Sequence, residues 1–303
     1  MTEFLARLTS GDFDAVISSR TTSIATAFII VCTLIAYFVF RRRDVVSDAA
    51  IKNTVATFGL YGFKVIFVPV AFFAESWIQA FYDALHIPYF PASIWNGWPI
   101  VLVLFIGFVA KDFVDYWTHR LMHTKWFWPV HAAHHSDTHV NGFAVFRVHF
   151  FEGILMRGSY IFLLTWAGFS NEHVAIIALL EVLHGAYVHL ETDFDHGPFN
   201  WLLASPRFHR WHHADNPEVF GKNLANHMPL YDIIFGTYHN PAPCRHAMGA
   251  LSDGIPDRNF VKLAILPFTL WKQRIQKTFD IVPAPGVAVG KNLAATAEIQ
   301  QAT

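Results

Sequence analysis

The sequence predicts an all-α fold: a multi-spanning membrane helical bundle of about four to five spans, with a helical cap on the cytoplasmic side. Three observations predict it. Of the 303 residues, 53% are hydrophobic and 15% are charged, whereas charged residues make up about 25% of an ordinary soluble domain. Long apolar segments recur along the chain. Histidines recur between these segments at helical spacing, and we expect the cap to hold them.

The first apolar segment, residues 24–40, contains no charged residue and ends at Arg41, Arg42 and Arg43. An uncharged segment of this length can span a bilayer, and arginines beside a span favour the cytoplasmic side. Because neither a basic leader nor a small-residue cleavage site accompanies it, a membrane anchor is favoured over a signal peptide. We therefore expect residues 1–54 to form an N-terminal segment with an anchor helix.

Four further apolar segments are predicted to enter the membrane: residues 55–74, 98–110, 154–169 and 174–189. The second of them crosses only if its helix continues through Lys111 and Asp112 and emerges with the first histidines. The last two are joined by a short turn, as in a membrane hairpin. Counting the crossings places every histidine cluster on the same side as the arginines, which is the cytoplasmic face.

The other segments are polar or amphipathic and set the expected domain boundaries. Residues 75–97 are aromatic and punctuated by prolines, which is typical of an interfacial stretch. Residues 55–243 form the membrane-embedded domain that carries the histidines. Residues 244–280 form an amphipathic interfacial segment, which includes the basic stretch 260–279. Residues 281–303 are rich in Pro, Ala and Gly and are expected to be a disordered tail.

The histidines form three short motifs. His119 and His123 stand at i and i+4, which places both imidazoles on one face of a helix. The motif H-x-x-H-H then occurs twice, again with its histidines on one helical face: His131, His134, His135, His209, His212 and His213. These eight histidines exceed the four ligands of a structural zinc ion, so two adjacent metal ions are the economical interpretation.

The type of ligand does not by itself select the metal, because neutral imidazole binds zinc, copper, iron and nickel. An apolar protein with a metal site on the cytoplasmic side faces lipid tails, whose C–H bonds require an activated oxidant. Zinc is redox-inert and cannot supply one, whereas a di-iron centre that reacts with dioxygen can. The sequence contains neither the H-E-x-x-H motif of zinc proteases nor the paired Glu-x-x-His set of carboxylate-rich di-iron bundles.

The motifs HRLMH (119–123), HAAHH (131–135) and HRWHH (209–213), in this order, resemble the three histidine boxes of one family. It is the fatty acid hydroxylase/sterol desaturase superfamily, which comprises membrane-bound histidine-box di-iron oxygenases. The resemblance covers about residues 55–240.

Three further segments extend the resemblance. NGFAVFRVHFFE (141–152) resembles the family's Asn…Arg-x-His-Pro-x-Glu stretch, with Phe150 in the usual place of proline. HGAY (184–187) resembles the H-S-G-Y segment of sterol methyl oxidases. Asn223 and PLYDIIFGTY (229–238) resemble the family's closing segment.

The resemblance implies two iron ions, dioxygen as co-substrate, and hydroxylation or desaturation of an unactivated C–H bond in a membrane lipid such as a sterol or a fatty acyl chain. Hydroxylation is favoured. An external electron donor of the ferredoxin or cytochrome b5 type is also implied, because the chain has no dinucleotide-binding fingerprint of its own. A bacterial inner membrane and an endoplasmic reticulum membrane both fit.

Two other functions are kept as alternatives. A carotenoid or terpenoid ring hydroxylase would use the same chemistry on another substrate. A histidine-rich membrane protein that binds or transports metal belongs to a different class, but transport requires polar residues along the spans. Lys64 is the one central charge that we find there. The net charge of −1 gives no reason to expect nucleic acid as a partner.

The resemblance implies nine metal ligands and no catalytic residue beyond them: His119, His123, His131, His134, His135, His184, His209, His212 and His213. Asp112 and Asp115 share the helical stripe of His119, and we interpret them as carboxylates that orient ligating imidazoles, with surface charge as the alternative. His189 and His227 are open candidates for extra ligands, although an ordinary histidine is the favoured interpretation. A structural polar support is favoured over a donor-docking patch for three more residues: Arg147, His149 and Glu152.

Overall fold

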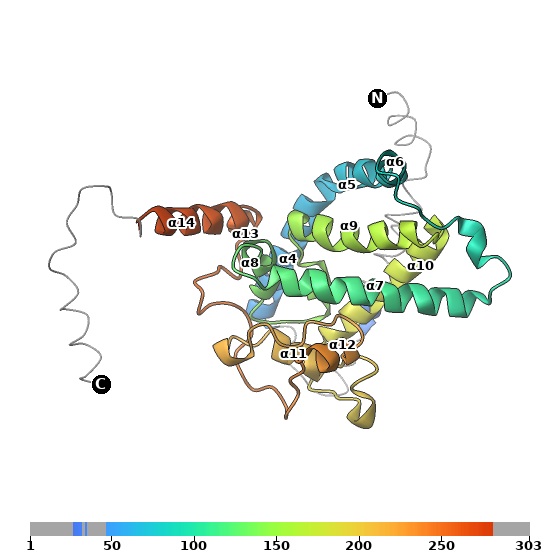
Figure 1. Cartoon of the computed structure of the whole chain (residues 1–303). Helices are drawn as coiled ribbons and strands as arrows, with labels where there is room; N and C mark the ends of the chain where they lie inside the picture. Colours follow the sequence, from blue (N-terminus) through green and yellow to red (C-terminus); the bar gives the residue numbers. More distant parts are fainter. Residues whose placement is uncertain (1–26, 32–33, 35–46, 281–303) are drawn as a thin grey trace, which may run out of the picture. The chain divides into compact units, whose positions relative to one another are not determined.

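The computed structural model describes residues 27–31, 34 and 47–280, and the elements named in this part are all α-helices or 3-10 helices (Figure 1). The predicted all-α class is therefore confirmed for these residues. Most of the predicted anchor and the whole predicted tail lie outside them. The chain divides into two compact units, Met1–Pro267 and Phe268–Thr303. Over the described ranges, no helix is both long enough and apolar enough to cross a lipid bilayer.

The helices follow one another along the chain in this order: α4 (Asp48–Ile66), α5 (Val68–Glu75), α6 (Ile78–Ala84), η2 (Ala92–Trp95), α7 (Ile100–Met122), α8 (Trp128–His135), η3 (Gly142–Phe146), α9 (Phe150–Trp166), α10 (Asn171–Val188), η4 (Gly197–Phe199), α11 (Pro206–His212), η5 (Pro217–Val219), α12 (Leu230–Phe235), α13 (Phe260–Ala264) and α14 (Leu266–Asp280).

The predicted apolar segment 55–74 is divided between two helices, α4 and α5, which are separated at Phe67. Pro69 explains the break. Proline has no N–H to donate to the carbonyl of Val65, and its ring clashes with the preceding turn. A new helix can nevertheless begin here, because proline is well tolerated in a first turn.

The helix of the next apolar segment continues as the predicted crossing requires: α7 runs through Lys111 and Asp112, carries His119 in its last turn and is capped by His123. α9 and α10 follow one another across the predicted short turn, and both pack against α7. Ser170 begins α10 with a capping box, in which its hydroxyl accepts from the backbone N–H of His173.

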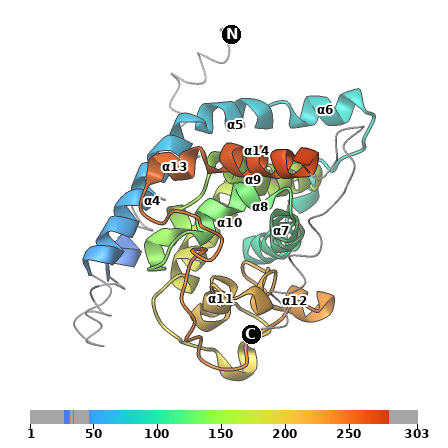
Figure 2. The ribbon, with the colours of Figure 1, turned by 90° about the vertical axis from the view of Figure 1, so that its left-hand side faces the viewer.

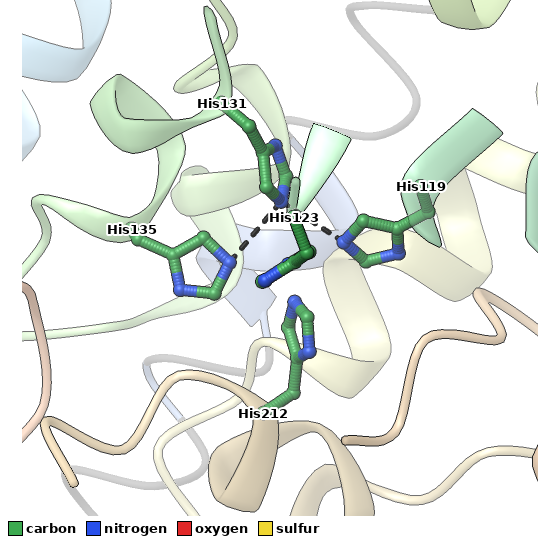
Figure 3. A group of neighbouring side chains, drawn as sticks. All are labelled: His119, His123, His131, His135 and His212. Carbon is green, nitrogen blue, oxygen red and sulfur yellow. Dashed lines mark hydrogen bonds between the residues drawn. The ribbon is translucent and has the colours of Figure 1, made fainter. Parts of the chain in front are cut away.

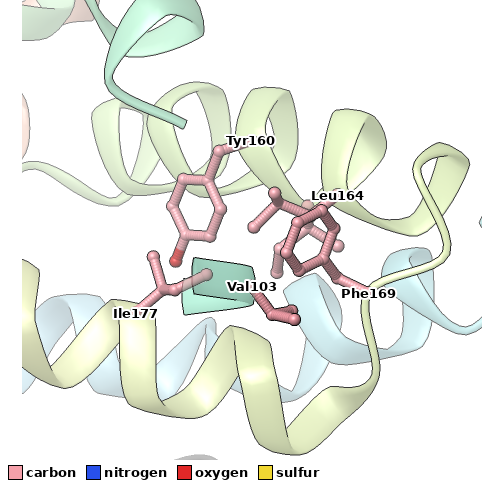
Figure 4. Close-up of a cluster of buried hydrophobic side chains, with 6 residues drawn as sticks. Val103, Tyr160, Leu164, Phe169 and Ile177 are labelled. Atoms are coloured by element: carbon pink, nitrogen blue, oxygen red, sulfur yellow. The ribbon is translucent and has the colours of Figure 1, made fainter. Parts of the chain in front are cut away.

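α7, α9 and α10 pack around a cluster of buried apolar side chains, which we call the apolar cluster (Figure 4): Val103, Tyr160, Ile161, Leu164, Phe169 and Ile177. Gly107 permits the close approach of α7 to this cluster. A Cβ atom at this position would lie 2.6 Å from side-chain atoms of both Ile177 and Phe169, which is far inside van der Waals contact.

Within the first unit, the two ribbon views agree on a layered arrangement. α5 and α6 lie on one side, α7, α9 and α10 lie in the middle, and α11 and α12 lie on the opposite side (Figure 2). α13 packs against α4. The C-terminal end of α7 thereby comes close to α8 and to the layer that contains α11, and the histidines meet there.

Candidate metal centre

Four helices contribute histidines at their C-terminal ends. His119 lies in the last turn of α7 and His123 caps this helix, while His189 caps α10. The two H-x-x-H-H motifs lie at the ends of α8 and α11: His131, His134, His135, His209, His212 and His213. The C-terminal end of a helix carries partial negative charge, so the convergence of four such ends favours a bound cation.

The first group contains five of these residues, each of which offers one ring nitrogen, and the five nitrogens lie within 4.8 Å of one another: His119, His123, His131, His135 and His212. Figure 3 shows the five rings arranged around one centre. His131 is central. Its Nε2 lies 2.9 Å from Nε2 of His119 and 3.1 Å from Nε2 of His135. We call this set the five-histidine group.

The second group, which we call the four-histidine group, contains four residues whose nitrogens again lie within 4.8 Å of one another: His134, His189, His209 and His213. Its Nε2 atoms are 2.9–3.3 Å apart in successive pairs. The two groups are neighbours, because the rings of His135 and His213 stack with their centroids 4.5 Å apart. α8 contributes to both groups.

Backbone carbonyls fix the protonation of several rings. Nδ1 of His134 lies 3.1 Å from the carbonyl oxygen of Arg147, and Nδ1 of His189 lies 2.6 Å from that of Gly185. A carbonyl oxygen only accepts, so each Nδ1 carries the hydrogen, and Nε2 of the neutral ring carries a lone pair. The Nε2 atoms of these two histidines are 3.3 Å apart. Two lone pairs at this distance cannot form a hydrogen bond, but a cation between them would satisfy both.

The five-histidine group leads to the same conclusion. His119 and His212 donate from Nδ1 to carbonyl oxygens at 2.7 and 2.9 Å, so their Nε2 atoms also carry lone pairs. Nε2 of His212 is buried without a hydrogen-bond partner, and so are both ring nitrogens of His123. Buried polar atoms without partners are rare in folded proteins and call for an explanation, such as a bound ion.

Protonation of the rings does not supply the hydrogen that is missing between these facing nitrogens. Burial, followed by the neighbouring histidines, lowers the pKa of His123 and His131 well below the ordinary value. Burial is also the main reason why the pKa of His134 and His213 is well below that value. The rings are therefore neutral near pH 7, and neutral imidazole is the form that binds transition metals. The donor set fits two metal ions.

The carbonyls that orient His119 and His212 belong to one largely buried segment, residues 222–228. Asp232 accepts from the backbone N–H groups of Leu224 and Ala225 at 2.7 and 2.8 Å. Asp112 accepts from the N–H groups of the two residues at the other end of the segment, at 3.0 and 2.7 Å. These two carboxylates thus hold the segment in place behind the imidazoles.

The two predicted orienting carboxylates therefore have different environments. The hydrogen bonds of Asp112 go to the 222–228 segment and to Nδ1 of His227. Asp115 forms a fully buried ion pair with Lys111. In the described part of the chain, the hydrogen bonds and ion pairs of both residues are made with groups outside the nine clustered rings. Asp112 and Asp115 themselves come close to His227, in a third set of nearby ligand atoms.

The structure places His184 outside both groups and His189 inside one. Nε2 of His184 lies 3.2 Å from the carbonyl oxygen of Ala204, and its ring neighbours that of His227. One signal in the sequence could have identified His189. It follows the last residue of an apolar helix, as His123 does, and box histidines gather at such helix ends.

The three residues considered as a polar support are all buried. The guanidinium of Arg147 donates to the carbonyl of Ala133 and to Ser136, and so connects the end of α8 to α4 through Asn53. Nε2 of His149 lies 2.9 Å from the carbonyl of Ala264. These contacts favour the structural interpretation over a docking patch.

Oε1 of Glu152, the third of these residues, lies 2.8 Å from Nδ1 of His131. Burial raises the pKa of Glu152 well above its ordinary value. A divalent cation bound at Nε2 of His131 would instead lower the pKa of Glu152, because a nearby positive charge favours the carboxylate. The sequence indicates Glu152 as part of a structural polar support, but not its contact with a histidine of the first group.

Comparison with known proteins identifies relatives of the central part of the chain. A family model described as "Fatty acid hydroxylase" matches residues 104–237, which include all nine clustered histidines. Ornithine lipid hydroxylase OlsE of Rhizobium tropici is 28% identical over 157 residues, which are 48% of this chain and 44% of the relative. Alkylglycerol monooxygenase of Homo sapiens is 31% identical over 144 residues, which are 46% of this chain and 32% of the relative.

A third relative carries a different name. Very-long-chain aldehyde decarbonylase GL1-11 of Oryza sativa subsp. japonica is 32% identical over 148 residues, which are 46% of this chain and 54% of the relative. The chain thus spans between about a third and just over half of the length of these curated relatives. No solved structure gives a significant match.

Proposed function

This chain belongs to the fatty acid hydroxylase superfamily, and on that premise we propose that it is an oxygen-dependent lipid hydroxylase with two iron ions. One observation supports this proposal most directly. Two adjacent sets of buried imidazoles direct Nε2 lone pairs toward one another, with separations that only a cation between them would make favourable.

We assign one ion to the five-histidine group and the other to the four-histidine group. The ligand set then contains the eight box histidines and His189, which takes the place that the resemblance gave to His184. When bound, a pair of iron ions would supply the redox chemistry with dioxygen that an unactivated C–H bond requires. The protein holds the Nε2 lone pairs in place through Nδ1 hydrogen bonds, so that little rearrangement is needed on binding.

Asp112 contributes to this arrangement indirectly. It holds the 222–228 segment, whose Leu224 carbonyl orients His119. We assign Asp115 a role as the buried counter-charge of Lys111 on α7, one helical turn before His119.

The proposed substrate is the fatty acyl or alkyl chain of a membrane lipid. The names of the relatives support an aliphatic chain over a sterol or carotenoid ring, because they refer to ornithine lipid, alkylglycerol and very-long-chain aldehyde. Two of these names also refer to insertion of oxygen, which favours hydroxylation over desaturation. Electrons would come from an external ferredoxin or a protein of the cytochrome b5 type.

We further propose that the chain is bound to a membrane, with the histidine groups on its cytoplasmic face. Large apolar side chains on the helices of the predicted spans are exposed, among them Val55 (64%), Ile66 (70%) and Val101 (76%). Such surfaces are unfavourable in water, and a lipid environment would cover them. A bacterial inner membrane and an endoplasmic reticulum membrane both remain compatible with this arrangement.

The test combines metal analysis with lipid analysis. We expect the purified full chain to contain two iron ions, and lipids of a host that expresses it to include species with one additional oxygen atom. Expression of a His134→Ala variant serves as the control for the lipids. One exchangeable zinc ion per chain together with unchanged host lipids would contradict the proposal and favour the metal-carrier alternative.

A further inference from the structure

The rings of the two groups differ in what holds their Nδ1 atoms. Four of them donate to neutral backbone carbonyls: His119, His134, His189 and His212. Nδ1 of His131 instead lies 2.8 Å from Oε1 of Glu152. Among the Nδ1 contacts described for the nine clustered rings, this is the one with a carboxyl group. Glu152 itself is 4% exposed and lies in the first turn of α9.

The position of His131 makes this contact consequential. Its Nε2 lies within 3.1 Å of the Nε2 atoms of two other members of the five-histidine group, so a small rotation of this ring would disturb the whole set. The ring also belongs to α8, whose next histidine, His134, serves the other group. A contact that orients His131 alone therefore acts on one group and not on the other.

General coordination chemistry gives the contact a function. A carboxyl group that accepts from the far nitrogen of a ligating imidazole fixes the tautomer and the ring plane, and makes the ligand more basic. Removal of such a partner typically weakens metal binding by about 10- to 100-fold. Neutral carbonyl oxygens fix the tautomer too, but hydrogen bonds to a charged acceptor are roughly twice as strong.

We propose that Glu152 is the positioning residue of the five-histidine group. By holding Nδ1 of His131, it directs Nε2 of this ring toward the shared centre, and the affinity and electronic environment of the ion in that group depend on it. The ion of the four-histidine group does not depend on it. This inference rests on the proposed function, because it assumes an ion in each group.

The test compares Glu152→Ala and Glu152→Gln with a matched control, Glu181→Gln. Glu181 lies on α10 and forms an ion pair with Lys111 at 3.2 Å. The full chain of each variant is purified anaerobically and titrated with ferrous iron, and the bound iron is examined by Mössbauer spectroscopy. We expect the wild type to hold two ions in two distinguishable environments.

In Glu152→Ala, the affinity of one site should fall by about 10- to 100-fold and its spectroscopic signature should disappear at limiting iron, while the other signature is retained. Glu152→Gln should restore part of the affinity, because an amide oxygen can still accept from Nδ1, but the signature of that one site should shift. Glu181→Gln should leave both sites as in the wild type.

Double variants identify which site responds. Glu152→Ala combined with His135→Ala should bind no less iron than His135→Ala alone, because both changes act on one group. Glu152→Ala combined with His213→Ala should bind less iron at limiting concentration than His213→Ala alone, because the site that remains is then weakened as well. Equal loss from both sites in Glu152→Ala, or two unchanged sites, would overturn the inference while leaving the proposed function intact. A wild type that binds fewer than two ions would overturn the proposed function, and this inference with it.

Discussion

The apolar cluster between α7, α9 and α10 and the histidine groups are both buried, but they are stabilised in different ways. The cluster consists of side chains such as Leu164 and Ile177, which pack without needing hydrogen-bond partners (Figure 4). The histidine groups depend on directional contacts, and several of their nitrogens lack a partner. An unsatisfied buried polar group costs about 1–3 kcal/mol.

This difference separates a region that provides stability from a region that needs a ligand. Packing of the apolar cluster is favourable whether or not metal is present. The histidine groups carry a cost that a bound cation would remove. We therefore expect changes in the first region to alter stability with little effect on metal content, and changes in the second to do the reverse.

The largest effect is expected for His134→Ala. This ring belongs to the four-histidine group, and α8 also carries two ligands of the other group. Turnover should be abolished and bound iron should fall by about one ion per chain, while the variant stays folded because the apolar cluster is untouched. Elemental analysis and product assays measure both quantities. Wild-type turnover in this variant would contradict the assignment of the metal centre.

A matched pair on α10 sharpens the ligand assignment. His189→Ala removes a ring whose Nε2 lies 2.9 Å from that of His209, whereas His184→Ala removes a ring outside both groups. We expect His189→Ala to lose about one ion and all turnover, and His184→Ala to retain both ions. The same iron analysis applies to both variants. The reverse result would restore His184 as the ninth ligand and exclude His189.

The box histidines could be predicted from sequence because their spacing is local: i, i+3 and i+4 on a short helix place the rings together whatever the rest of the fold does. The partners of their Nδ1 atoms could not be predicted, because three of these partners are backbone carbonyls, and any residue type can supply a carbonyl. Leu224 and Lys222 orient rings from α7 and α11 only because the 222–228 segment folds back against them.

Two further contacts of the metal centre could not be predicted from the sequence, because they also depend on how distant segments pack. His189 adds no motif of its own, so its place in the four-histidine group follows from the approach of α10 to α8 and α11. Asp112 lies on the predicted stripe of α7, but it reaches the centre through backbone N–H groups of a segment far along the chain. The break between α4 and α5, in contrast, was visible in the sequence as Pro69, although the apolar character of the segment outweighed it.

A smaller effect on the centre is expected for Asp232→Asn. Its carboxylate accepts from Leu224 and Ala225, and the amide that replaces it can supply only one oxygen for these two N–H groups. Loss of such a hydrogen bond to a charged group costs about 1.5–3 kcal/mol. Because Leu224 orients His119, iron affinity should fall by about tenfold without complete loss. An iron titration of the purified variant measures this, and an unchanged affinity would separate the 222–228 segment from the centre.

The smallest effect on the centre is expected for Leu164→Ala, although its effect on stability is large. The side chain is fully buried in the apolar cluster, and its truncation leaves a cavity. Substitutions of this kind destabilise a protein by about 2–5 kcal/mol. Bound iron at low temperature should nevertheless equal that of the wild type, because no ligand or orienting contact involves this residue. Thermal unfolding measures the stability of the variant, and elemental analysis of the same preparation measures its bound iron. Loss of iron in proportion to the loss of stability would show that the two regions unfold as one cooperative unit, and that their stabilities cannot be varied independently.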